Sequence, residues 1–105
     1  MSSLHDQLMR RLRKLGVEER SVPGRDDGFS TLVHDGKEFA HFHHATELDL
    51  RLGRDAIERE GLVHPPDSTV HPKRSRNSQW IELRLASSKD IVHIVRLVAM
   101  AVASR

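Results

Sequence analysis

The sequence has no cysteine and few aromatic residues, and both shortages narrow what the protein can do. Without cysteine there can be no disulfide bond, no thiolate metal ligand and no cysteine nucleophile. Aromatic residues make up 4% of the chain, which leaves little material for a surface that stacks nucleic-acid bases. The sequence carries no signature of a known nucleic-acid-binding motif, no nucleophile-elbow serine and no glycine-rich phosphate loop.

Long apolar runs are also absent. The longest stretch, residues 91–103, is interrupted by His93 and Arg96 and is too short to span a bilayer. The first six residues lack the apolar core of a signal peptide. These features predict a cytoplasmic protein with no membrane partner.

What the sequence does have is the composition of a folded domain. It contains 105 residues, of which 37% are hydrophobic and 30% charged, and this is enough for one modest core. The same balance disfavours a disordered chain. The net charge is only +2, so we expect no strongly cationic surface. Residues 1–105 are therefore predicted to form a single domain.

Hydrophobic periodicity predicts a helix near each end of the chain. Leu4, Leu8, Leu12 and Leu15 recur at helical spacing before Gly16, which supplies a stop. Near the C-terminus, residues 87–90 form a capping-box-like start for a second helix. The apolar face of that helix consists of Ile91, Ile94, Val95, Val98 and Val102.

Between these helices, period-two alternation predicts strands over residues 29–34, 37–43, 47–52 and 79–85. Asp35-Gly36 is a strong signal for a two-residue hairpin turn. A short helix over 54–60 and a short strand over 62–64 are also expected. The predicted fold is α+β, a mainly antiparallel sheet covered on one face by the N- and C-terminal helices. Its expected core residues are Phe42, Leu48, Leu50, Ile81, Leu83, Ile94 and Val98.

The stretch 36–53 is the centre of this fold, and its register decides what lies on each face of the sheet. A tight turn at Ala45-Thr46 would put His41 and His43 beside the leucines in the core. A loop one residue longer would put Phe42 there instead. We favour the longer loop, because an unpaired buried imidazole costs roughly 1–3 kcal/mol.

Pairing through the Asp35-Gly36 turn then has a second consequence. In a regular ladder it places Phe29, Thr31 and Val33 on the apolar face and His34 on the face of the histidines. The sheet would thus have one apolar face and one polar face.

The polar face gathers the residues that are the best candidates for a site. We predict that His41, His43, Asp49, Arg51 and Trp80 bind a ligand. The chemistry of two imidazoles beside a carboxylate suits a divalent metal such as zinc, iron or manganese, with His41, His43 and Glu47 as its ligands. His41 and Asp49 could also act as an acid–base pair, although such a pair is just as often a structural hydrogen bond.

Two family patterns bear on these residues. The spacing Gly-x4-His-x-His-x3-Glu-x5-Gly, from Gly36 to Gly53, nearly matches the first metal motif of the cupins. Both glycine spacings are one residue short, and no second cupin motif is present.

A fuller resemblance is to a bacterial and fungal family of uncharacterised proteins known as the luciferase-like domain. It covers residues from Gly36 to the C-terminus, through Ala-His-x-His at 40–43, Leu-Asp-Leu at 48–50, His-Pro at 64–65 and Trp-Ile-Glu-Leu at 80–83. Family members commonly have a small residue where this chain has Gln79. The resemblance implies a shared architecture and a shared polar site, and implies no particular reaction.

Several functions are compatible with these residues. The first is a small binding domain that holds a small molecule, an anion or a divalent metal in the His/Asp/Glu cluster. The second is an enzyme that uses the same cluster. The third is weak, salt-sensitive nucleic-acid binding through residues 73–76 (Lys-Arg-Ser-Arg) and the N-terminal arginines. Self-association into a homo-oligomer is a fourth. His64 and His71 could add ligands, whereas His5, His44 and His93 are expected at the surface.

Overall fold

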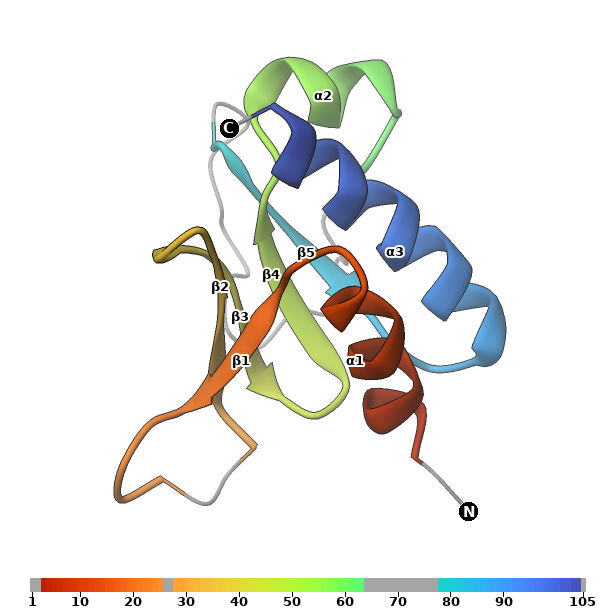
Figure 1. The fold of residues 1–105 in the computed structure, drawn as a ribbon. Helices are drawn as coiled ribbons and strands as arrows, with labels where there is room; N and C mark the ends of the chain where they lie inside the picture. Colours follow the sequence, from red (N-terminus) through yellow and green to blue (C-terminus); the bar gives the residue numbers. More distant parts are fainter. Residues whose placement is uncertain (1–2, 26–27, 64–77, 105) are drawn as a thin grey trace.

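The structure is a computed structural model, and it describes residues 3–25, 28–63 and 78–104. Its elements are α1 (Leu4–Arg13), β1 (Glu18–Ser21), β2 (Ser30–His34), β3 (Lys37–His44), β4 (Glu47–Arg51), α2 (Arg54–Arg59), β5 (Trp80–Arg84) and α3 (Ser88–Ala103). The strands form one antiparallel sheet in the order β1-β2-β3-β4-β5. Helices α1 and α3 lie together on one face of it (Figure 1). This arrangement confirms the predicted α+β class.

The two long helices begin where their sequences predict. The side chain of Ser3 accepts a hydrogen bond from the backbone N–H of Asp6 and so caps α1. At the start of α3, Ser87 and Asp90 form the predicted capping box. The buried residues of α3 are Ile91, Ile94, Leu97, Val98 and Ala101. Val95 and Val102 are only partly buried, so the apolar face is centred nearer Leu97 than predicted.

The β2–β3 hairpin has the predicted turn. Asp35 and Gly36 have φ angles of 54° and 76°, the positive values that this turn requires at both positions. The ladder then shifts by one residue, because Val33 pairs with Glu38 whereas Leu32 pairs with Ala40. The residue between them on β3 is therefore a β-bulge.

This bulge reverses the predicted facing of β2. Thr31 pairs with His41, and the ring of Phe29 stacks on that of His41 at 5.6 Å, so both lie on the polar side. His34 lies beside Gly16, just after α1. The prediction that Phe29 and Thr31 share the apolar face, with His34 beside His41, is wrong because a bulge moves every later side chain across the sheet.

A second bulge corrects the predicted β3–β4 loop. His44 pairs with Glu47, so the turn at Ala45-Thr46 has two residues and the longer loop is not formed. The register shifts between Phe42 and His44, and the extra residue is His43. The extra residue in the bulge shifts the β3–β4 register by one residue, which is the shift that the longer loop was predicted to produce. Phe42 therefore opposes Leu48 on the apolar face, as predicted.

The core lies between the sheet and the two long helices. All seven residues predicted for it are buried. They are joined by Leu8, Met9 and Leu12 of α1, and by Ile57 of α2. We call this side of the sheet the helix face and the opposite side the far face.

Some elements differ from the predicted ones. The structure has an additional strand, β1, and residues 62–63 form no strand. His5 is not a surface residue: its ring lies against Phe42, and its Nε2 lies 2.8 Å from Glu19 Oε2. The predictions for His64, His71 and the basic segment 73–76 fall outside the described residues.

Within the described part of the chain, no helix has the length and hydrophobicity to cross a membrane.

Candidate functional site

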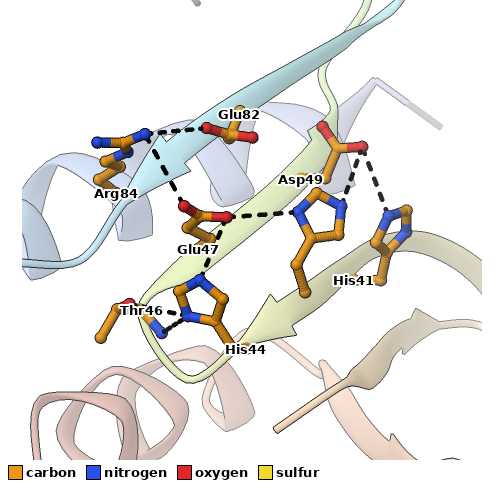
Figure 2. Close-up of polar contacts among 8 residues, drawn as sticks. His41, His44, Thr46, Glu47, Asp49, Glu82 and Arg84 are labelled. Atoms are coloured by element: carbon orange, nitrogen blue, oxygen red, sulfur yellow. Dashed lines mark hydrogen bonds and ion pairs between the residues drawn. The ribbon is translucent and has the colours of Figure 1, made fainter. Parts of the chain in front are cut away.

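Polar side chains from β3, β4 and β5 meet on the far face of the sheet. His41 pairs with Asp49 across β3 and β4, and Asp49 pairs with Glu82 across β4 and β5. Two residues further along each strand, Glu47 pairs with Arg84. Figure 2 shows these side chains converging over the three strands. The alternation that buries the leucines of β4 on the helix face places these carboxylates together on the far face.

His41, His43 and Asp49 form the first half of this cluster. The nitrogen Nε2 of His41 lies 3.5 Å from Asp49 Oδ2, and Nε2 of His43 lies 4.0 Å from the same oxygen. The two imidazole rings are 5.0 Å apart. The side chains of His41 and His43 are 21% and 10% exposed, whereas that of Asp49 is 2% exposed. One potential ligand atom from each residue lies within 4.8 Å of the others, close enough to hold one metal ion.

His43, Glu47 and Glu82 form the second half, and their potential ligand atoms also lie within 4.8 Å of one another. Nδ1 of His43 is 3.8 Å from Glu47 Oε2, so the two ring nitrogens of His43 face the two halves. Arg84 Nη2 lies 3.8 Å from Glu47 and 3.7 Å from Glu82 (Figure 2). His44 Nε2 lies 3.3 Å from Glu47 Oε2.

The electrostatics of the cluster favour a cation. Glu47, Asp49 and Glu82 are all buried, and Arg84 is the guanidinium that lies between two of them. With neutral imidazoles, three carboxylates and one guanidinium give a formal charge of −2. Burial, and then the neighbouring charge of His41, lower the pKa of His43 below its ordinary 6.5. A lowered pKa favours the neutral form of His43, which is the form that binds a metal.

Two of the predicted ligand-binding residues lie at the border of the cluster. Trp80 contacts His41, with 5.3 Å between ring centres, and opposes Arg51 across β4 and β5. Arg51 is exposed and lines a groove toward the end of α3. The rings of Phe29 and Trp80 both lie beside the imidazole of His41. The structure therefore brings together His41, His43, Glu47, Asp49 and Trp80, whereas Arg51 opposes Trp80 at the border of this set and lines the groove.

Sequence reasoning did not include Glu82 and Arg84 among the site residues. The alternation of residues 80–84 placed Glu82 and Arg84 away from the core, but no sequence signal said that β5 pairs with β4. His44 is exposed, as predicted, with 47% of its side chain accessible. The bulge at His43 nevertheless brings its Nε2 to 3.3 Å from Glu47 Oε2.

Comparison with known proteins places the chain in a family. A family model described as the Luciferase domain matches residues 36–101, more than half of the chain, and the chain belongs to this family. The matched region begins at the β2–β3 turn and includes every residue of the far-face cluster. No curated protein and no solved structure matches the chain.

Proposed function

We propose that this member of the Luciferase domain family binds a divalent transition-metal ion through His41, His43 and Asp49, with Glu47 beside them. One observation carries the proposal: two imidazoles and a buried carboxylate converge at the spacing of metal ligands. Imidazole nitrogens and carboxylate oxygens together suit zinc and its neighbours in the first transition row. Residues of β3 and β4 supply the whole set, so two paired strands hold it in place.

The spacing favours a shared ion over simple hydrogen bonds. Hydrogen bonds between imidazole nitrogen and carboxylate oxygen are usually about 2.7–3.2 Å long. The two distances from Asp49 Oδ2 to the imidazole nitrogens, 3.5 and 4.0 Å, are longer. In a tetrahedral zinc site with bonds of about 2.0–2.1 Å, neighbouring ligand atoms are roughly 3.4 Å apart. To reach that spacing, Asp49 Oδ2 would have to approach His41 Nε2 by about 0.1 Å and His43 Nε2 by about 0.6 Å.

Charge and burial support the same conclusion. Burying a carboxylate is costly unless it is paired or coordinates a metal. Glu47 Oε2 is buried, and none of its contacts with described residues has the geometry of a hydrogen bond, although His44 Nε2 lies 3.3 Å from it. A divalent ion would compensate for the formal charge of −2 that the cluster carries when its imidazoles are neutral.

The proposed site would leave room for a further ligand. Three protein ligands leave the fourth tetrahedral position of zinc open, as in catalytic zinc sites. The partial exposure of His41 gives that position a route to solvent. A small molecule or anion could bind there, and an enzyme acting through the metal is the second candidate function. In an enzyme that works without the metal, His41 and Asp49, 3.5 Å apart, would instead be an acid–base pair.

The test uses protein purified without a histidine tag and stripped with EDTA. Calorimetric titration with Zn²⁺ should show binding at one ion per chain, together with a higher Tm. The chain has one tryptophan, and its ring contacts His41. Paramagnetic Cu²⁺ bound at His41 should therefore quench the fluorescence of Trp80 with the same stoichiometry.

The double variant His41→Gln, His43→Gln should lose both responses. His93→Gln is the matched control, because His93 lies on α3, across the sheet from the cluster. Equal stabilisation of the parent and the double variant by Zn²⁺ would contradict the proposal. Stabilisation by Cu²⁺ without quenching of Trp80 would place the ion elsewhere.

A further inference from the structure

A groove beside the end of β4 is lined by cationic side chains and has no part in the proposed metal site. Two adjoining hollows of about 350 and 360 Å³ share Leu52, Gly53, Gln79 and Ser104 as lining residues. Each hollow is within the size range of small-molecule sites, which begins at about 300 Å³. Together they form one groove between α2, the end of α3 and the starts of β3 and β5.

Four cationic residues line this groove, and they come from three different elements. They are Lys37 at the start of β3, Arg51 at the end of β4, and Arg54 and Arg59 of α2. Asp55 is the one carboxylate among the described residues that line it. Arg54 is paired with Glu58 at 2.6 Å, which leaves the cations at positions 37, 51 and 59 as the main source of positive potential.

The wall of the groove is held by Gln79. Its Oε1 accepts a hydrogen bond of 2.9 Å from the backbone N–H of Arg54, and its carbonyl oxygen accepts one of 2.9 Å from Gly53. These bonds tie the start of β5 to the start of α2. They also leave the side-chain NH₂ of Gln79 as a donor in the lining.

We propose that this groove binds a small, multiply charged anion of the phosphate class. Guanidinium groups match phosphate and carboxylate oxygens with paired hydrogen bonds, and cations gathered in a concave site raise the local concentration of anions. Gln79 and Ser104 add neutral donors that would orient the anion. Arg51 opposes Trp80, which contacts His41, so the groove lies next to the metal cluster without sharing a residue with it.

The experiment is an NMR titration of ¹⁵N-labelled protein stripped with EDTA, at constant ionic strength. Pyrophosphate should shift the amide signals of Gly53, Arg54, Gln79 and Ser104 in a saturable way, and chloride should not. Citrate, tested in parallel, separates a site for phosphate from one for any polyanion. Stronger binding of citrate than of pyrophosphate would overturn the phosphate assignment.

The variant Arg51→Gln, Arg59→Gln should weaken pyrophosphate binding by at least about tenfold, since each lost charge-assisted hydrogen bond contributes on that order. Arg10→Gln, Arg11→Gln removes the same charge from the exposed side of α1 and should have no such effect. His41→Gln, His43→Gln should also keep its affinity, so loss of the metal site and loss of the anion site are distinguishable. Equal weakening in both arginine variants, or no saturable shift in the parent, would refute the groove.

Discussion

Replacement of Arg84 by Gln tests the charge balance of the far-face cluster most directly. Arg84 Nη2 lies 3.8 Å from Glu47 Oε1 and 3.7 Å from Glu82 Oε2. Both glutamates are buried, and one oxygen of each lies within 4.8 Å of the other. Removing the guanidinium leaves these two carboxylates facing each other. Arg84→Gln should therefore destabilise the metal-free protein.

The size of the loss follows from these distances. Two unit charges 4.8 Å apart repel by roughly 3.5 kcal/mol at an effective dielectric constant of about 20. The side chain of Arg84 is 37% exposed, so water already screens part of its attraction for the glutamates. We therefore expect a loss of about 2–3 kcal/mol, somewhat below the 3–5 kcal/mol typical of a fully buried pair that is broken.

The assay is urea denaturation of parent and variant, each in EDTA and in saturating Zn²⁺. A bound divalent ion would supply positive charge to the same carboxylates. The difference in unfolding free energy between parent and variant should therefore shrink when Zn²⁺ is present. Arg84→Lys keeps the charge and should cost less than Arg84→Gln. A difference that is the same in EDTA and Zn²⁺, or no difference at all, would refute this account of the cluster.

Two further predictions concern the helix face. The hydrogen bond between His5 and Glu19 raises the pKa of His5 above 6.5 and lowers the pKa of Glu19 below 4.5. The charge of Asp6 also raises the pKa of His5, and the charge of Arg13 also lowers the pKa of Glu19. The stability difference between the parent and His5→Gln, followed by urea denaturation against pH, should thus peak between about pH 4.5 and 6.5. It should fall above this window as His5 loses its proton, and below it as Glu19 gains one; a flat profile would contradict the pairing. Leu50→Ala should cost about 2–5 kcal/mol, because Leu50 is fully buried; a loss under 1 kcal/mol would argue against the core.

Much of the fold was readable from the sequence because its local signals agree. Alternation over residues 47–52 assigned Leu48 and Leu50 to the core and Asp49 to the far face, and the structure has them so. The Asp35-Gly36 turn and the capping box of α3 depend on neighbouring residues only, and both were found as predicted. A period of two or 3.6 and a turn dipeptide need no knowledge of distant contacts.

The features that were missed depend on contacts between distant residues. Strand β1 is a polar edge strand, Glu-Glu-Arg-Ser, with no apolar alternation to mark it. Glu19 lies on the helix face because β1 pairs with β2. Its carboxylate lies 2.8 Å from His5 Nε2 and holds that imidazole in a partly buried position. Glu82 lies in the cluster because β5 pairs with β4, although the two strands are far apart in the sequence. No local pattern in the sequence specifies such pairings.

Deletion of His43 tests how the β3–β4 register is fixed. His43 is the extra residue of the bulge, and on either side of it Phe42 already opposes Leu48 and His44 already opposes Glu47. Without it these pairs would follow one another in a regular ladder, and every other side chain would keep its face. The variant should therefore fold, with the cross-strand NOE between Phe42 and Leu48 retained. His44 would then directly follow Phe42 on the far face, so Zn²⁺ stabilisation should survive the deletion and disappear when His44→Gln is added. A variant that fails to fold, or in which Phe42 no longer opposes Leu48, would show that the bulge itself is required for the register.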